Sequence, residues 1–425
     1  MHLPVTKSRL ENGLTVLLRP MRHAPVISFW VWYRVGSRNE RPGITGASHW
    51  VEHMMFKGSP DFPPGSLDRL VSREGGRYNA FTWIDFTAYF ETMPAGRIDL
   101  ALRLEADRMA NAIMTEEAVN SERTVILSER HMYENEPSFL LHEGLVAAAF
   151  QRHPYRHDTI GEQADLESMS RDDLFDHYRR YYAPNNATVV VAGDFEPEAM
   201  LARVGELFGP TPAVDDGQGV VEAEPPQAEE RRLTVRGPGD TAYVTAAYHA
   251  PAASDPDFLP LVLLNAAFAG GSSLGFTGGG SNKSSRLYKA LVNGDLAAAV
   301  SGGLAASIDP YIYTINAVAR PGRQLAEIEA RLDEELDMLA RQPIGPAELG
   351  KALKRAKVQF VTAGESVTGQ GQMIGLAETV AGDFRWYEDA LEAIGRVTLE
   401  DIERVRARYL RPERRTVARY EPLGE

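Results

Sequence analysis

The sequence of 425 residues contains no cysteine, and this absence removes several kinds of chemistry at once. Disulfide bonds, thiol nucleophiles, thiolate zinc sites and iron–sulfur clusters all need cysteine sulfur. Any metal held by this protein must therefore be bound by histidine, aspartate or glutamate side chains.

Long apolar runs are also missing. No stretch of about 18 apolar residues occurs, and residues 1–13 have neither the basic start nor the apolar core of a leader peptide. We therefore expect a soluble protein, which would be periplasmic if a leader was removed and cytoplasmic otherwise.

Positive charge is scarce. Lysine and arginine number 45 against 59 aspartates and glutamates, so the formal net charge is −14. Proteins that bind nucleic acid need a basic surface, and the basic clusters at 231–232 and 404–408 are short. The charge balance argues against nucleic acid as a partner and suits a basic peptide better.

A break in composition divides the chain. Residues 209–230 concentrate proline, glycine and acidic residues, a composition typical of a solvated linker. On either side, residues 1–208 and 231–425 open with strand-like alternation and continue into helical patterns. We predict an α+β fold of two homologous halves, each a mostly antiparallel sheet covered by helices; two unrelated domains are the alternative. Strands are predicted at 13–20, 26–36, 187–195, 231–236, 242–250 and 312–320, a hairpin over 78–93, and helices at 196–207, 257–269, 324–340 and 399–410.

The residues most indicative of chemistry are His49, Glu52 and His53. Side chains four positions apart lie on one face of a helix, so the two histidines could present their imidazoles to one metal ion. Glu52 lies at the neighbouring edge, where its carboxylate could take a proton from a water that zinc acidifies. This is the inverted form of the H-E-x-x-H zinc motif, and a random chain of this composition would contain it about 0.03 times. The alternative is a pair of surface histidines near a glutamate.

A zinc site of this kind needs a third protein ligand. Glu122 and Glu129 are seven residues apart, which places both on one face of a helix. One of them could complete the site, and the other could orient a histidine from behind. The remaining histidines lack ligand spacing, and we expect no metal binding from His23, His131, His142, His153, His157, His177 or His249.

Further motifs connect these residues to a known family. The sequence resembles the pitrilysin/insulinase family of zinc metallopeptidases and, within it, the subfamily of short subunits similar to the mitochondrial processing peptidase. The matching motifs span most of the chain: L-x-N-G-L-T-V at 10–16, H-x-x-E-H at 49–53 with Met54, Phe56, Lys57 and Gly58, Gly75-Gly76, 79–82, Thr87-x-Tyr89, Glu122 and Glu129, Pro184-x-Asn186, Gly193-Asp194, and Ser284 to Leu287.

The resemblance implies a role for each site residue. Glu129 lies 76 residues after His53, the spacing that the family uses for its third ligand. The implied ligands of one Zn²⁺ per chain are therefore His49, His53 and Glu129. Glu52 is implied as the general base. Glu122 is implied as an acidic residue of the catalytic site that contacts a ligand rather than the metal. The resemblance also implies an edge strand that binds the substrate peptide by backbone pairing, formed by Asn79, Ala80, Phe81 and Thr82.

One feature of the family is missing. Members that are active alone usually carry, after the Ser-Arg-Leu helix of the second half, an arginine and a tyrosine seven residues apart that bind substrate and stabilise the oxyanion. Leu291 and Ala298 occupy these positions. Arg236 and Tyr243 are also seven residues apart, but they lie at the opening of the second half and not after the Ser-Arg-Leu helix. The sequence therefore predicts a zinc endopeptidase subunit that hydrolyses peptides or unfolded segments in a closed chamber, in a heterodimer with a homologous partner that supplies the Arg/Tyr pair.

Two other readings stay open. The chain could be a non-catalytic core-type subunit, as some relatives are, or a self-sufficient homodimeric peptidase. The glycine-rich stretch 269–285 contains no phosphate-binding motif, and it is interpreted either as a flexible loop that contacts substrate or partner, or as a plain connection.

Overall fold

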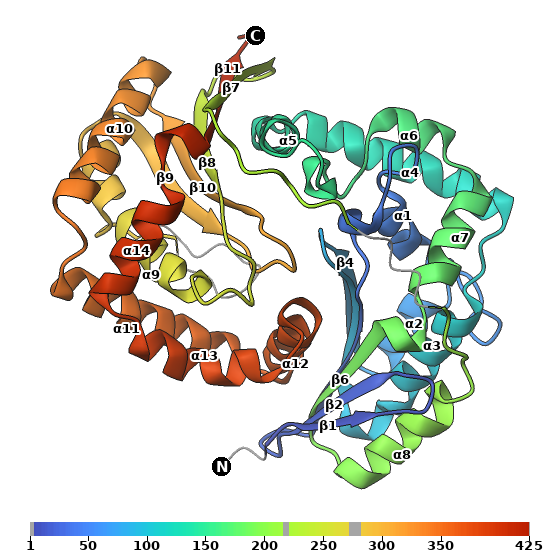
Figure 1. Ribbon diagram of the computed structural model, residues 1–425. Helices are drawn as coiled ribbons and strands as arrows, with labels where there is room; N and C mark the ends of the chain where they lie inside the picture. The colour runs from blue at the N-terminus through green and yellow to red at the C-terminus, as the bar shows by residue number, and fades with distance from the viewer. Residues whose placement is uncertain (1–3, 216–220, 272–281, 425) are drawn as a thin grey trace. The chain divides into compact units, whose positions relative to one another are not determined.

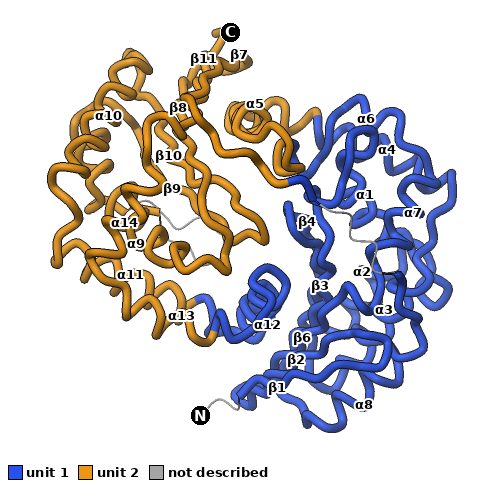
Figure 2. Tube along the Cα trace, in the orientation of Figure 1, with its two compact units in different colours: residues 1–130, 157–222, 363–387 blue, residues 131–156, 223–362, 388–425 orange. Residues whose placement is uncertain are grey.

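The computed structural model describes residues 4–215, 221–271 and 282–424 (Figure 1). They form two compact units, each assembled from three segments of the chain. Unit 1 contains residues 1–130, 157–222 and 363–387, and unit 2 contains residues 131–156, 223–362 and 388–425 (Figure 2). Each unit is built on one sheet covered by helices, so the predicted α+β fold is confirmed.

The sheet of unit 1 has six strands in the order β1-β2-β6-β3-β5-β4. Neighbouring strands are antiparallel except β2 and β6, which run parallel. The predicted hairpin over 78–93 is the β4–β5 pair at one edge of the sheet. The strands are β1 (Thr6–Arg9), β2 (Thr15–Pro20), β3 (Val26–Tyr33), β4 (Arg77–Thr82), β5 (Thr87–Pro94) and β6 (Ala187–Gly193).

The sheet of unit 2 repeats this topology. Its order is β7-β11-β8-β10-β9, with β7 and β11 parallel and the other pairs antiparallel. Counted from β2 in unit 1 and from β7 in unit 2, both sheets follow the same order, 1-5-2-4-3, which is the arrangement expected of two homologous halves. The strands are β7 (Arg231–Gly237), β8 (Tyr243–His249), β9 (Ala297–Leu304), β10 (Ile312–Ala319) and β11 (Arg415–Pro422).

Strand β3 is buried on both faces, because helices lie on both sides of the unit 1 sheet (Figure 1). One face contacts α12, whose Gly371 and Gly375 lie against the indole rings of Trp30 and Trp32. A Cβ on Gly375 would lie 2.0 Å from Trp32 Nε1, so only glycine permits this approach. The helices of unit 1 are α1 (Ala47–Met54), α2 (Leu67–Arg73), α3 (Asp99–Asn111), most of α4 (Glu116–Glu134), α6 (Gln163–Ser168), α7 (Arg171–Tyr181), α8 (Pro197–Phe208) and α12 (Val367–Leu376).

The two halves exchange one helix each. Helix α12 comes from the second half of the chain but packs on the sheet of the first. Helix α5 (Pro137–Ala149) comes from the first half and packs on β7 and β11, with Gly144 against Leu233. The other helices of unit 2 are α9 (Phe258–Phe268), α10 (Leu325–Arg341), nearly all of α11 (Pro346–Ala363), most of α13 (Arg385–Arg396), and α14 (Leu399–Tyr409).

Part of the predicted linker is anchored in unit 2. The Glu224 carboxylate accepts hydrogen bonds from the backbone N–H groups of residues 151, 152 and 153, at 2.8 to 3.1 Å. Gln227 is buried and donates to the carbonyl oxygen of Arg415 at 2.8 Å. Residues 216–220 lie outside the described residues, as do residues 272–281 of the glycine-rich stretch. The first part of 209–230 is held as well, because Asn12 donates to the Thr211 carbonyl and Asn185 exchanges two hydrogen bonds with the Val214 backbone.

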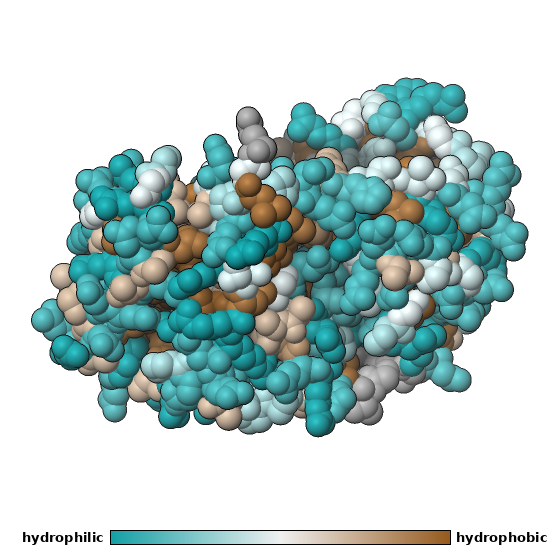
Figure 3. All heavy atoms as spheres, turned by 90° about the horizontal axis from the view of Figure 1, so that it is seen from above, coloured by the Kyte–Doolittle hydropathy of each residue, from teal (hydrophilic) through white to brown (hydrophobic). Residues whose placement is uncertain are grey.

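Hydrophilic side chains dominate the face of the molecule seen in Figure 3, with smaller hydrophobic areas between them. This agrees with a composition in which 24% of the residues are charged. Among the described residues, no helix combines the length and apolar character needed to cross a lipid bilayer.

Candidate metal centre

Helix α1 carries the H-x-x-E-H motif, and its first turn is held by a buried carboxylate. The helix begins after Gly46, which has φ = 88°, and a Cβ at this position would lie 2.5 Å from the carbonyl oxygen of Ile160. Glu40 accepts hydrogen bonds from the backbone N–H groups of Gly46 and Ser48, each at 2.8 Å. A carboxylate at a helix N-terminus satisfies free donors and stabilises the helix dipole. The backbone is therefore held by a hydrogen bond at Ser48, the residue before His49.

Within α1, the apolar residues and the motif residues face different ways. Trp50, Val51 and Met54 are fully buried. His49 and His53 lie four positions apart, with their ring centroids 4.7 Å from each other. The core side chains fix the rotation of the helix, and this rotation brings the two imidazoles to the same side.

Helix α4 supplies the two glutamates. Its core-facing residues Val119 and Ile126 are seven positions apart, as are Glu122 and Glu129. Arg123 secures this helix: its guanidinium lies over the Trp50 ring at 4.8 Å and donates to the carbonyl oxygen of Met169 at 2.8 Å. Both glutamates thus face α1, as the seven-residue spacing suggests.

The structure brings His49, His53 and Glu129 together as one group of side chains able to hold a metal ion. Their ligand atoms all lie within 4.8 Å of one another. Glu129 Oε2 is 3.9 Å from His49 Nε2 and 3.6 Å from His53 Nε2. In a tetrahedral zinc site with bonds of about 2.05 Å, ligand atoms are about 3.3 Å apart. The three residues therefore fit zinc in donor type, and these two separations are about 0.3 and 0.6 Å longer than in a tetrahedral site.

Glu122 lies behind this group and contacts the far side of one imidazole. Its Oε1 is 2.9 Å from His53 Nδ1, and its Oε2 forms an ion pair with Lys57. Burial acts to raise the pKa of Glu122, but the contacts with His53 and Lys57 outweigh it and lower this pKa. An ionised Glu122 keeps the proton of His53 on Nδ1 and leaves Nε2 free to bind a metal.

The two histidines differ in their electrostatic environment. Burial, together with His53, lowers the pKa of His49 to about 4, so this imidazole is neutral at pH 7. Burial also acts to lower the pKa of His53, but its hydrogen bond to Glu122 and the nearby carboxylates raise it overall. A metal ion would therefore compete with a proton mainly at His53.

Glu52 is 8% exposed and does not belong to the ligand group. The Thr82 hydroxyl donates to Glu52 Oε2 at 2.6 Å. Burial raises the pKa of Glu52, although the hydrogen bond from Thr82 and the charge of His53 act in the opposite direction. A carboxylate with a raised pKa is a better proton acceptor, as a general base must be.

The four residues predicted to bind substrate form the end of β4, which is an edge strand of the unit 1 sheet. Trp83 N donates to the carbonyl oxygen of Phe86 at 2.8 Å, which makes these two residues a hydrogen-bonded pair. Since such pairs alternate along an antiparallel ladder, the backbone groups of Thr82 and Ala80 point away from β5. Ala80 N meets the Asn79 side chain instead, at 2.9 Å.

Sequence reasoning missed the residues that hold α1 in place. His157 Nε2 lies 3.0 Å from Glu40, and His177 Nε2 lies 3.0 Å from the Ser48 hydroxyl. Asp165 accepts from Thr45 N and from the Thr45 hydroxyl, just before the helix. These partners lie more than 100 residues away along the chain, so no local spacing could have revealed them. The two histidines, predicted not to bind metal, are placed as hydrogen-bonding partners near α1.

The second half carries no equivalent ligand group among the described residues. The two positions of the missing Arg/Tyr pair lie in unit 2. Leu291 is fully buried in the short π-helix Tyr288–Val292, and Ala298 is an exposed residue of β9.

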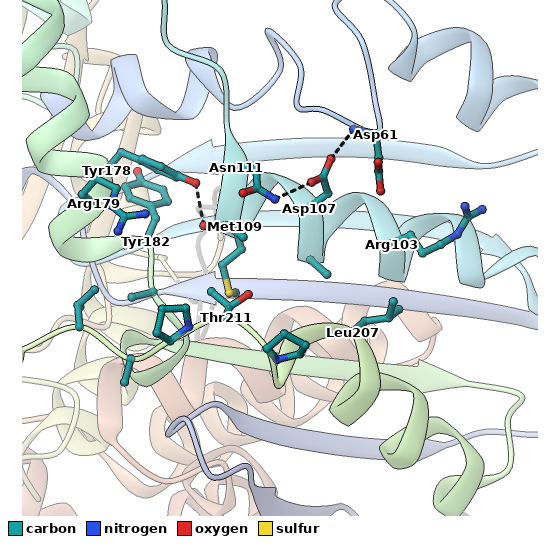
Figure 4. A pocket seen from close by; sticks show the side chains of 17 residues that line it. Asp61, Arg103, Asp107, Met109, Asn111, Tyr178, Arg179, Tyr182, Leu207 and Thr211 are labelled. Carbon is teal, nitrogen blue, oxygen red and sulfur yellow. Dashed lines mark hydrogen bonds between the residues drawn. The ribbon is translucent and has the colours of Figure 1, made fainter.

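A separate hollow of about 570 Å³ exists in unit 1, and Figure 4 shows it from close by. Some of its polar groups are bound to one another: Asn111 donates to Asp107 at 2.9 Å, and Asp107 accepts from Asp61 N at 3.0 Å. His49, His53 and Glu129 do not line it. The lining residues are Asp61, Arg103, Ala106, Asp107, Met109, Ala110, Asn111, Tyr178, Arg179, Tyr182, Ala183, Leu207, Pro210, Thr211, Pro212, Ala213 and Val214.

The duplicated α+β fold, together with an H-x-x-E-H helix facing a glutamate, is the arrangement of the zinc metallopeptidases of the pitrilysin/insulinase type. Residues 15–163 match the family model "Insulinase (Peptidase family M16)", and residues 168–356 match "Peptidase M16 inactive domain". The chain belongs to this family, and to its subfamily of short subunits similar to the mitochondrial processing peptidase.

Several relatives are similar along nearly their whole length. The zinc protease PqqE of Helicobacter pylori is 29% identical, over 86% of this chain and 81% of the relative. The uncharacterized zinc protease YmxG of Bacillus subtilis is 25% identical over 97% of both chains. The β subunit of the mitochondrial processing peptidase of Lentinula edodes is 26% identical, over 95% of this chain and 87% of the relative. The crystal structure of a protease from Helicobacter pylori superimposes with a TM-score of 0.91, at 26% identity, and covers 99% of this chain and 100% of that one.

Proposed function

We propose that this chain is the zinc-binding subunit of an endopeptidase that hydrolyses peptides or unfolded segments. The observation that carries the proposal is the convergence of His49, His53 and Glu129 in unit 1, with the buried carboxylate of Glu52 beside them. A scaffold protein has no need of such a group, because buried acids and imidazoles are costly to desolvate.

His49, His53 and Glu129 would hold one Zn²⁺, which when bound polarises the scissile carbonyl and acidifies a water molecule. Glu52 accepts the proton of the attacking water and then donates it to the leaving amine. Glu122 keeps His53 in the tautomer and orientation that the ion requires.

The edge strand β4 would bind the substrate. The outward-facing backbone groups of Thr82 and the Ala80 carbonyl can pair with an extended peptide, which would add a strand to the sheet. The Ala80 N–H, which now donates to Asn79 Oδ1, would exchange this bond for one to the peptide. Backbone pairing gives affinity with little dependence on sequence. Thr82 and Glu52 are joined by a hydrogen bond, so a peptide paired at this end of β4 would lie beside the general base.

A homologous partner would complete the site. Leu291 and Ala298 have no polar side-chain atoms with which to stabilise an oxyanion, and Leu291 is fully buried. Losing one oxyanion donor typically costs 10² to 10³ in rate, about 3 kcal/mol. We therefore propose a heterodimer whose second subunit contributes an arginine and a tyrosine to a closed chamber.

Metal analysis and peptide hydrolysis test the enzymatic part. The wild-type chain should carry about one zinc per chain, and His49→Ala should carry almost none. Glu52→Gln should keep its zinc while its hydrolysis falls at least about 10³-fold, because the proton acceptor is lost. A wild-type chain that binds no zinc after exposure to Zn²⁺ would refute the proposal.

The partner is tested by reconstitution. The purified chain is assayed alone and after mixing with the product of a neighbouring gene of the same family that carries the Arg/Tyr pair. We expect a gain of at least about 10²-fold on mixing, corresponding to a restored oxyanion donor. Full activity of the isolated chain would contradict the heterodimer and favour the self-sufficient homodimer.

A further inference from the structure

Thr82 links the edge strand to the proposed general base. It is the last residue of β4, and its hydroxyl donates a 2.6 Å hydrogen bond to Oε2 of Glu52 on α1. This is a short, charge-assisted contact to a carboxylate that is 8% exposed. Among the described residues, Thr82 is the only side chain recorded as a hydrogen-bond donor to Glu52.

The surrounding hydroxyls fix the direction of this bond. Thr87 lies opposite Thr82 on β5, with the two Oγ1 atoms 3.3 Å apart. Thr87 gives its only hydroxyl hydrogen to the carbonyl oxygen of Val35, at 2.9 Å, and therefore has none for Thr82. Thr82 is therefore the donor in either contact, and its hydrogen goes to the nearer acceptor, Glu52 Oε2 at 2.6 Å, rather than to Thr87 Oγ1 at 3.3 Å.

The two carboxylate oxygens of Glu52 differ in their contacts. Oε2 is occupied by Thr82, whereas no hydrogen-bond partner of Oε1 is recorded in the part of the chain that the structure describes. A carboxylate held through one oxygen cannot rotate freely, so its second oxygen keeps a defined position. A general base needs such a position, because proton transfer depends on hydrogen-bond reach.

We propose that Thr82 is a positioning residue for Glu52. Its hydroxyl holds Oε2 and presents Oε1 to the water, while its backbone belongs to the strand edge where the peptide pairs. This inference rests on the proposed function, since it assigns Glu52 the role of base. It adds a side-chain role to a residue that sequence reasoning connected only with peptide binding.

Two substitutions at one position test the proposal. Thr82→Val keeps the shape and strand preference but removes the hydroxyl, and Thr82→Ser restores it. We expect Thr82→Val to lower kcat about ten- to a hundredfold, the effect of losing a hydrogen bond to a charged group, with KM and zinc content little changed. Thr82→Ser should recover most of kcat. Thr92→Val, which removes a hydroxyl of β5 that contacts Ser28 and Thr368, is the matched control and should leave kcat near the wild-type value.

Different results would overturn the positioning role of Thr82 and the proposed peptidase function. An unchanged kcat in Thr82→Val, or a loss that Thr82→Ser does not recover, would overturn the positioning role while the peptidase function stands. Absence of zinc-dependent cleavage by the wild-type chain, alone and with its partner, would overturn the function and the role of Glu52 with it. A crystal structure of Thr82→Val gives a readout without turnover: we expect the Glu52 carboxylate to leave its present rotamer, and an unmoved carboxylate would overturn the inference.

Discussion

Removing the carboxylate of Glu122 should weaken zinc binding without removing a ligand. Glu122 Oε1 is 2.9 Å from His53 Nδ1, and the Glu122 side chain is 5% exposed, so water cannot readily replace it. In Glu122→Ala, His53 loses the acceptor that fixes its tautomer, and Lys57 loses its ion-pair partner. Changes of this kind typically lower metal affinity 10- to 100-fold, or about 1.4 to 2.8 kcal/mol. Glu122→Gln keeps an acceptor but loses the charge, and we expect a loss of about three- to tenfold.

The assay is competition for Zn²⁺ with a chromophoric chelator, at fixed pH and ionic strength. Glu117→Ala is the matched control, because Glu117 lies on the same helix and is exposed. We expect this control to bind zinc as the wild type does. The reasoning is refuted if Glu122→Ala retains wild-type affinity, or if Glu117→Ala loses as much.

Three further predictions concern packing, pH and metal removal. Gly375→Ala should lower the free energy of unfolding by about 3 kcal/mol, because its Cβ would lie 2.0 Å from Trp32 Nε1. Gly350→Ala on α11 meets no atom within 4 Å and should stabilise by up to about 1 kcal/mol; urea denaturation compares the two, and equal effects would contradict the packing argument. Burial lowers the pKa of His177 to about 4, against about 6.5 in the unfolded chain. Since the unfolded chain binds this proton more tightly, the free energy of unfolding should fall between about pH 6.5 and pH 4, by up to about 1.4 kcal/mol per pH unit. In His177→Gln, the free energy of unfolding should change less between pH 7 and pH 5, as measured by urea unfolding. An equal change in the variant and the wild type would contradict the lowered pKa of His177. Chelation of zinc should lower the Tm of the wild type but not that of His49→Ala, because a bound ion stabilises only the folded chain; scanning calorimetry with and without chelator checks this.

The local part of the candidate site follows from the sequence alone. His49, Glu52 and His53 lie within five residues, so helix geometry alone places their side chains near one another. Glu122 and Glu129 could be paired in the same way, but only the family resemblance distinguished the proposed ligand from the residue behind it. Glu40 and Asp165, which hold the start of α1, were not predicted, because they reach that helix from irregular or distant segments.

The sequence by itself determined the α+β class and the positions of most strands, because alternation of apolar residues is a local property of the chain. It did not predict β1, β9 or β11. It also determined which residue types could bind a metal. Only the tertiary structure decided that α5 packs on the sheet of unit 2 and α12 on the sheet of unit 1. An apolar helix face indicates that a helix is covered, but not by which sheet. The sheet on which a helix packs depends on how well the helix surface and the sheet surface fit together. On α12, for example, Gly371 and Gly375 leave room for the rings of Trp30 and Trp32.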